Sequence, residues 1–76
     1  MKLAVFDLGT NTFNLLICEI VGKKPKGIYA TKEFVQLGKG GINNKILRED
    51  SIARAMYCLA RFNETCREFE VDQIFA

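Results

Sequence analysis

The spacing of the apolar residues changes part-way along the chain, and this change restricts the possible fold more than any other feature. In the first half, compact β-rich segments separated by turn-forming residues predict strands at about 2–8, 12–21 and 28–37. In the second half, apolar residues recur every three or four positions, which predicts one amphipathic helix over about 48–69. A β-type segment from about residue 73 predicts a fourth strand. The order β-β-β-α-β indicates an α/β fold in which one long helix covers a mixed sheet.

The predicted strands differ in their expected surroundings. The short apolar run in "KLAVFDL" predicts a central strand that is buried on both faces, whereas the polar middle of "GIYATKEFVQLG" predicts an edge strand or an exposed face. Between the second and third strands, "GKKPKG" predicts a hairpin with Pro25 at the second turn position and Gly27 at the last. Its lysines are expected at a solvated tip.

The predicted helix has a wide apolar face, from which we expect Met56, Leu59 and Phe62 to lie in the core. Charged residues are expected on the solvent face: Arg54, Arg61, Glu64, Arg67 and Glu68. Either Asp50 or Ser51 could cap the first turn. Three strands would leave part of the apolar face uncovered, and the chain stops at an apolar "QIFA". We therefore expect an N-terminal piece of a larger domain.

Composition excludes several classes of function. A net charge of +2 is too small to indicate a nucleic acid or an anionic membrane as partner, and no apolar stretch approaches the roughly 18 residues of a membrane-spanning helix. Cys18, Cys58 and Cys66 have apolar neighbours and no CxxC spacing, which predicts reduced core cysteines in a cytoplasmic protein. The chain has no histidine, so any chemistry must use carboxylates, hydroxyls, amides, main-chain groups or a bound cation.

The stretch "DLGTNT" places small, turn-forming residues directly between two predicted strands. Gly9 allows close approach of the main chain to a ligand, and the amides and hydroxyls of Thr10, Asn11 and Thr12 could offer converging donors to a phosphate. Asp7 would repel a bare phosphate and therefore needs a cation such as Mg²⁺. An ordinary hairpin turn, in which Asp7 is a local acceptor, explains the same residues, so both interpretations stay open.

Other glycine-containing stretches carry less information. Neither the Walker sequence GxxxxGK[ST] nor the dinucleotide sequence GxGxxG is present. "GKGG" at Gly38–Gly41 favours a plain flexible loop over a second phosphate-binding loop.

Two stretches resemble one phosphatase family. "DLGTNTFNLLI" resembles the phosphate-1 motif, D-x-G-[ST], of the superfamily of actin, sugar kinases and heat-shock chaperones, which has a ribonuclease-H-like fold. Within it, D-[IL]-G-S-N-S is typical of exopolyphosphatases and guanosine pentaphosphate phosphatases. "VQLGKGGINNKILREDSIARAMYCLARF" is similar to that family's R-L-G-x-G and L-[ST]-x-E-A-I-x-R-A stretches. The chain departs from the family where basic residues or a Ser/Thr cap are common: Asn14, Gln36 and Arg48.

The resemblance implies that residues 1–76 form the N-terminal portion of an actin-like ATPase-type domain. Asp7 would help to hold Mg²⁺ or another divalent cation. The phosphate-binding residues would be Gly9, Thr10, Asn11 and Thr12. The family hydrolyses a terminal phosphoanhydride with water activated by a glutamate, which would lie beyond Ala76. We therefore expect no catalytic residue in this chain, and no activity from the chain alone.

The implied substrates are inorganic polyphosphate and guanosine penta- or tetraphosphate, between which the sequence does not choose. The implied partners are the rest of the same polypeptide and a second copy in a cytoplasmic homodimer, with no membrane or nucleic acid. Two other classes stay open. One is an ATP-dependent small-molecule kinase or actin-like protein with the same turn, and the other is a non-catalytic module that binds the alarmone.

Overall fold

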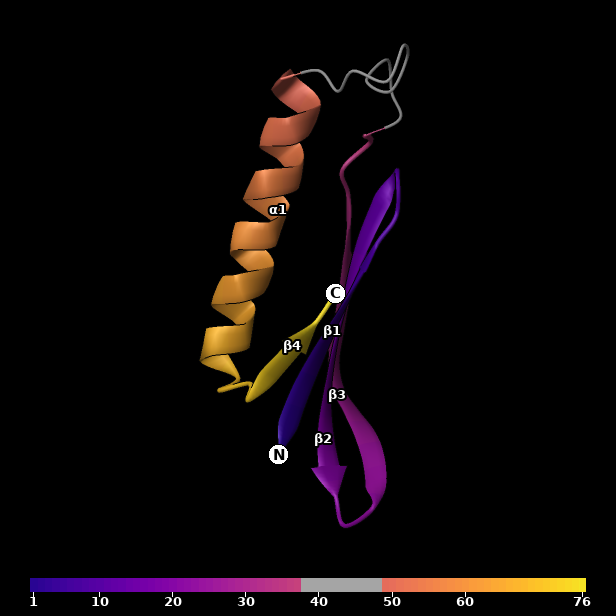
Figure 1. Ribbon diagram of the computed structural model, residues 1–76, viewed down its shortest axis with the longest axis vertical. Coiled ribbons are helices and arrows are strands. Elements are labelled where there is room, and N and C mark those ends of the chain that lie inside the picture. The colour runs from indigo at the N-terminus through magenta and orange to yellow at the C-terminus, as the bar shows by residue number, and fades with distance from the viewer. Residues whose placement is uncertain (38–48) are drawn as a thin grey trace.

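The computed structural model describes residues 1–37 and 49–76. Figure 1 shows a twisted sheet with a single helix along one side. The elements in chain order are β1 (Lys2–Leu8), β2 (Thr12–Val21), β3 (Lys24–Phe34), α1 (Glu49–Glu68) and β4 (Gln73–Phe75). The sheet order is β3-β2-β1-β4, with β4 parallel to β1 and the other neighbours antiparallel. The predicted mixed sheet with one long helix is confirmed, as is the edge position of β3. In the described ranges, no helix is long and apolar enough to cross a membrane.

The turn between β2 and β3 differs from the prediction. Only Gly22 and Lys23 separate the two strands, and Gly22 has a φ of 65°. A positive φ at the first central position alone is typical of a type II′ hairpin turn, which favours glycine there. Pro25, predicted in the turn, instead lies in β3 opposite Ile20. An edge strand tolerates proline because its outer side needs no ladder hydrogen bonds, so β3 begins earlier than predicted.

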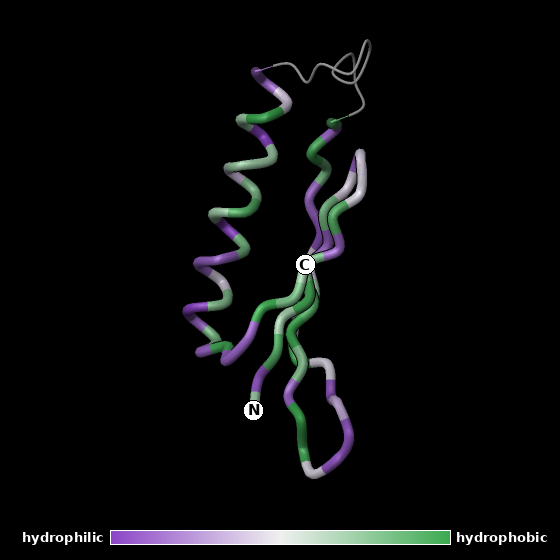
Figure 2. The backbone as a smooth tube through the Cα atoms, in the orientation of Figure 1, coloured by the Kyte–Doolittle hydropathy of each residue, from purple (hydrophilic) through white to green (hydrophobic). Residues whose placement is uncertain are grey.

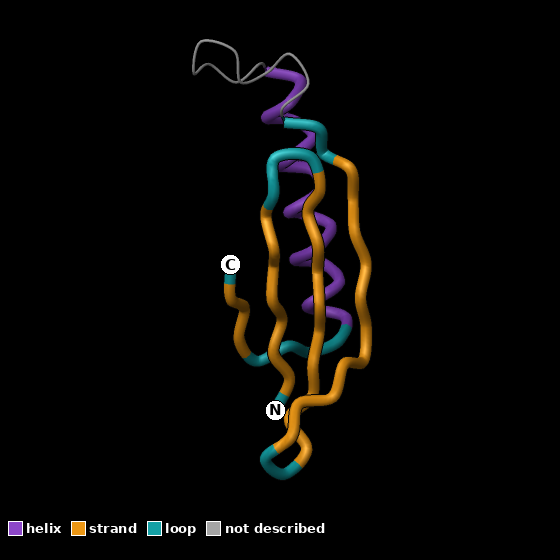
Figure 3. The backbone as a smooth tube through the Cα atoms, turned by 90° about the vertical axis from the view of Figure 1, so that its right-hand side faces the viewer, coloured by secondary structure: helices purple, strands orange, loops and turns teal. Residues whose placement is uncertain are grey.

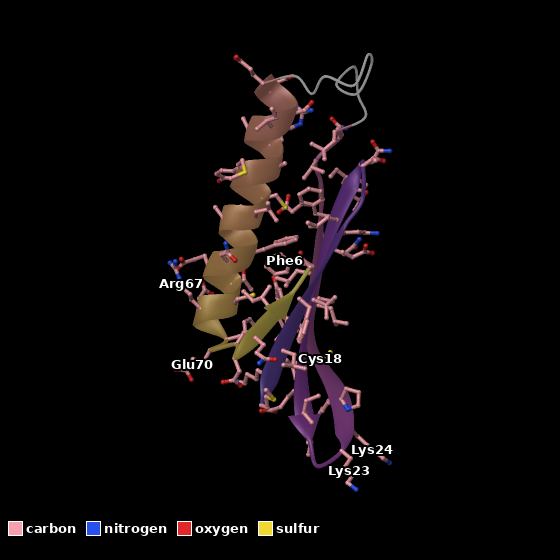
Figure 4. All side chains as sticks on the ribbon, viewed as in Figure 1. Phe6, Cys18, Lys23, Lys24, Arg67 and Glu70 are labelled. Atoms are coloured by element: carbon pink, nitrogen blue, oxygen red, sulfur yellow. The ribbon has the colours of Figure 1, made fainter. Side chains whose placement is uncertain are left out.

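The core lies between α1 and the side of the sheet that faces it. Phe6 of β1 points toward α1, where its ring meets Phe62 edge to face at a centroid distance of 5.4 Å (Figure 4). Apolar segments of the strands lie side by side in this region (Figure 2). The buried residues alternate along β1 and β2 and recur on α1: Ala4, Phe6, Phe13, Leu15, Ile17, Val35, Cys58, Phe62 and Cys66.

The other face of the sheet is uncovered. Figure 3 views the sheet from this side, with α1 behind it. Val5 and Leu16 are cross-strand neighbours there and remain 42% and 41% exposed. The prediction that the first strand is buried on both faces is therefore wrong for the described residues, because α1 covers one face only. Cys18, also predicted in the core, is half-buried on the open face.

The buried stripe of α1 lies at a different helical phase from the predicted one. Phe62 is buried as predicted and Leu59 is half-buried, but Met56 is 61% exposed, so its assignment to the core is wrong. The stripe instead includes Ser51, which is fully buried, and Cys58. Spacings of three and four residues fit both phases, and packing against the sheet selects the one that contains Ser51.

The end of α1 turns the chain directly into β4. Glu70 has a φ of 56°, and the main-chain N–H groups of Glu70 and Val71 donate to carbonyls of the last helical turn at 3.0 Å. This is the hydrogen-bond pattern of a Schellman cap, here with glutamate where glycine is usual. The next residue, Asp72, bonds Lys2 twice: its N–H donates to the Lys2 carbonyl, and its carboxylate accepts from the Lys2 N–H, both at 2.8 Å.

Candidate functional site

The turn between β1 and β2 brings the predicted site residues together. Asp7 lies near the end of β1, Thr12 begins β2, and the three residues Gly9, Thr10 and Asn11 lie between them near one end of the sheet. The lysines of the β2–β3 hairpin lie at the opposite end, as Figure 4 shows for Lys23 and Lys24. The only lysine cluster of the described hairpins is therefore remote from this turn.

Gly9 closes the turn. Its N–H donates to the carbonyl of Thr12 at 3.1 Å, and a Cβ atom on Gly9 would lie only 3.1 Å from that same oxygen. The Gly9 amide is thus engaged within the protein. The amides of Thr10 and Asn11 make no hydrogen bond to any described residue, and both residues are exposed. The turn is therefore a tight hairpin connection that leaves two main-chain donors for another partner.

The segment just after β3 supports this turn, a role that the sequence analysis did not predict for it. The carbonyl of Asn11 accepts hydrogen bonds from the N–H groups of Val35 and Gln36, at 2.8 and 3.0 Å. Arg54, predicted on the solvent face, instead points its guanidinium at the carbonyl of Val35, with a distance of 2.8 Å from Nε to the oxygen. The prediction for Arg54 is wrong because its position on the helix reaches the chain just after β3. Helical periodicity carried no signal for this contact.

A row of polar residues crosses the open face close to the turn. Asp7 is the cross-strand partner of Asn14, and Asn14 is in turn the partner of Lys32 on β3. Asp7 and Lys32 are exposed, and Lys32 makes no ion pair with any described residue. Beside Asn14 and Lys32 is a hollow of about 430 Å³, whose floor includes Leu16 and Ala30. The row thus places one positive charge within two strands of the Asp7 carboxylate.

Asp7 can contribute to a cation site but cannot form one with its described neighbours. No group of three or more His, Cys, Asp or Glu side chains suited to a metal ion occurs within residues 1–37 and 49–76. Mg²⁺ usually takes only one or two carboxylates and completes its shell with water and substrate phosphates. The exposed Asp7 carboxylate could supply one such oxygen ligand, while the Thr10 and Asn11 amides could hold a phosphate that also binds the metal. The GKGG loop at 38–41 lies outside the described residues.

Two of the three cysteines, Cys58 and Cys66, are poorly suited to act as nucleophiles. Burial raises the pKa of the Cys58 thiol, the Glu33 carboxylate raises it further, and Arg61 lowers it. Burial also raises the pKa of the Cys66 thiol. Both side chains belong to the core cluster, and all three cysteines are free thiols. Since the thiolate is the reactive form, Cys58 and Cys66 are packing residues.

Comparison with known proteins connects this turn to one family. The chain is 38% identical to an exopolyphosphatase from Cytophaga hutchinsonii, whose crystal structure superposes with a TM-score of 0.93 over 97% of this chain. Over nearly its whole length, the chain is similar to part of the exopolyphosphatase and Ppx/GppA phosphatase proteins. An Aquifex aeolicus Ppx/GppA phosphatase is similar over 97% of the chain, with 25% identity and a TM-score of 0.90. A guanosine-5′-triphosphate,3′-diphosphate pyrophosphatase of Pseudoalteromonas atlantica is 34% identical over 71 residues, or 93% of the chain.

The match to this family covers nearly all of the chain but only part of each relative. The chain spans 24% and 25% of the two solved structures and 14% of the pyrophosphatase. No protein-family model matches the chain. The fold of the Ppx/GppA relatives is therefore present here as part of a domain, and the turn between β1 and β2 is the candidate site within it.

Proposed function

We propose that the protein carrying this chain is a phosphohydrolase that releases terminal phosphate from inorganic polyphosphate or guanosine pentaphosphate. The chain supplies the first phosphate-binding turn. The observation that carries the proposal is that Thr10 and Asn11 are exposed and that their amides bond no described residue, in a chain similar to an exopolyphosphatase. Main-chain N–H groups that converge on one point bind phosphate oxygens without adding bulk.

In this proposal, the residues of the turn have distinct roles. Thr10 and Asn11 donate main-chain N–H groups to a phosphoryl group, Thr12 adds its hydroxyl, and Gly9 fixes the tight connection. Asp7 holds Mg²⁺, which when bound neutralises charge on the phosphoanhydride. Such positioning and charge stabilisation are the main protein contributions to phosphoryl transfer. The base that activates water comes from the rest of the polypeptide.

Lys32 adds a positive charge to the proposed phosphate site. The family resemblance leads one to expect a basic residue or histidine at position 14, where this chain has an uncharged asparagine. Lys32 is the direct cross-strand partner of Asn14. Two strand spacings, about 10 Å, separate the Lys32 and Asp7 backbones. We assign to Lys32 the electrostatic contact with a phosphate next to the one held by the turn.

The proposal extends to a cytoplasmic homodimer with no membrane or nucleic-acid partner. Three free cysteines favour a reducing compartment, and the net charge of +2 gives no electrostatic basis for nucleic-acid binding. The family resemblance is the basis for the second copy.

The test is phosphate release by the whole protein from polyphosphate and from guanosine pentaphosphate, with Mg²⁺ and with the metal chelated. We expect Asp7→Asn to lower Mg²⁺-dependent release at least 100-fold. Glu64→Gln is the matched control, because Glu64 is an exposed carboxylate on α1 and, among the described residues, pairs only with Arg67. It should leave the rate within twofold of the original.

Three other outcomes would contradict the proposal. Near-normal turnover by Asp7→Asn would remove Asp7 from the metal site. A phosphorylated product that forms only with ATP would favour the kinase class. Tight binding of the labelled alarmone with no phosphate released over hours would favour a non-catalytic module. The relative rates on the two substrates would identify which one the protein prefers.

A further inference from the structure

The carbonyl of Asn11 lies in a small concave site formed by the chain just after β3. It accepts from two successive N–H groups, those of Val35 and Gln36, at 2.8 and 3.0 Å. Successive amides converge in this way when the backbone passes from right-handed to left-handed conformation. Gln36 has a φ of 54°, which a residue other than glycine rarely adopts. The turn is therefore held by a segment in an unfavourable conformation, which needs support from its surroundings.

Arg54 of α1 contacts the same two residues from the other side. Its Nε donates to the Val35 carbonyl at 2.8 Å, and its Nη2 donates to the Gln36 carbonyl at 3.1 Å. Nη2 also donates to the hydroxyl of Ser51 at 3.2 Å, and the Ser51 side chain is fully buried. A planar guanidinium can satisfy two neighbouring carbonyls at once, which a lysine ammonium does less well. Arg54 thus holds Val35 and Gln36 by their carbonyls while their amides hold Asn11.

We propose that Arg54 is a positioning residue for the phosphate-binding turn. The connection runs from α1 through Arg54 to Val35 and Gln36, and from their amides to Asn11, whose own N–H is one of the two free donors. This inference rests on the proposed function. Arg54 also forms an i,i+4 pair with Asp50 at 3.4 Å, but exposed pairs of this kind contribute little. The contacts to the carbonyls, and not this pair, give Arg54 its role.

The experiment compares Arg54→Ala and Arg54→Lys in the whole protein with Arg67→Ala. Arg67 lies on the same helix and forms an exposed pair with Glu64, so it is a matched control. Four quantities are measured well below the melting temperature. They are kcat and KM for polyphosphate, amide hydrogen exchange, and the amide shifts of the turn on adding tripolyphosphate with Mg²⁺.

We expect Arg54→Ala to raise KM at least fivefold and to lower kcat/KM at least tenfold. Hydrogen exchange at Val35 and Gln36 should accelerate at least tenfold, while exchange at the core strand residue Ile17 stays within twofold. Tripolyphosphate should shift the Thr10 and Asn11 amides of the original protein and of Arg67→Ala, but less in the Arg54 variants. Arg54→Lys should recover only part of the loss, and it provides the test if Arg54→Ala does not fold.

Two results would overturn the inference. One is faster exchange at Val35 and Gln36 with kcat/KM and the tripolyphosphate shifts unchanged, because Arg54 would then be structural only. The other is unchanged exchange at both residues. If the original protein releases no phosphate from either substrate, the proposed function fails. The exchange and shift measurements would still decide whether Arg54 positions the turn.

Discussion

Replacing Gly9 by alanine tests how closely the turn between β1 and β2 is packed. The new Cβ would lie 3.1 Å from the Thr12 carbonyl oxygen, whereas ordinary van der Waals contacts begin at 3.4 Å. The oxygen must therefore recede by about 0.3 Å, and it belongs to the main chain that closes the turn. Gly9→Ala thus forces a backbone shift and lengthens the hydrogen bond from the residue 9 N–H to Thr12.

The expected loss of stability follows from two opposing effects. Overpacking that shifts backbone costs about 1–3 kcal/mol, while the lower entropy of alanine in the unfolded chain returns about 0.4–1 kcal/mol. We expect a net loss of about 1–2 kcal/mol. A displacement of about 1 Å at a reacting group can lower a rate about 100-fold, so a shift of a few tenths of an ångström should lower kcat/KM on the order of 3- to 10-fold.

The assay is urea unfolding together with phosphate release from polyphosphate, both on the whole protein. Gly27→Ala is the control, because a Cβ there would meet only the Cδ1 atom of Leu16, at 3.8 Å. It should change stability by less than about 0.5 kcal/mol and leave the rate within twofold. If Gly9→Ala proves as stable and as active as Gly27→Ala, the turn is not packed as described and Gly9 has no special role.

Lys32→Gln should raise KM for polyphosphate about fivefold and weaken the salt dependence of KM. Lys23→Gln, at the distant hairpin tip, should leave both quantities unchanged. If the two variants change KM equally, the phosphate contact assigned to Lys32 is excluded. At pH 7.5, iodoacetamide should modify Cys18 before Cys58 or Cys66, as peptide mapping would show, because only Cys18 is outside the core. Folding raises the pKa values of Cys58 and Cys66, so these neutral thiols contribute to the free energy of unfolding. This contribution is complete below the unfolded pKa of about 8.5 and is lost as pH rises through the folded values. Unfolding free energies at pH 7 and 10 should show this fall, and it should be smaller in Cys58→Ala; an equal fall would contradict the assignment.

The sequence predicts the parts of the fold that depend on local patterns. The bounds of β1 and β2 follow from apolar runs beside Gly9 and Gly22. The turn at Pro25 was mispredicted because proline and glycine both favour turns, and only the pairing of Val21 with Lys24 shows that the tighter connection forms. The phase of α1 was mispredicted because the spacing alone does not distinguish Met56 from Ser51 as a core residue.

For the candidate site, the sequence identifies the turn but not its support. The motif places Asp7 beside the turn, and the structure shows which amides remain free. The contact of Arg54 with Val35 and Gln36 joins residues 19 and 18 positions apart, and no helical pattern distinguishes such an arginine from a solvent-facing one. Hydrogen bonds to main-chain carbonyls do not depend on the partner's residue type, so they leave little trace in sequence.

The parallel pairing of β4 with β1 has a consequence for synthesis in the cell. Val5 pairs with Phe75, and the Lys2 amide bonds Asp72 across 70 positions. The hairpins of β1, β2 and β3 can form as soon as they leave the ribosome, but this edge of β1 stays unpaired until β4 emerges. Unpaired strand edges readily join other chains. We therefore expect the nascent chain to be more open to aggregation before residues 73–75 emerge than after they pair with β1.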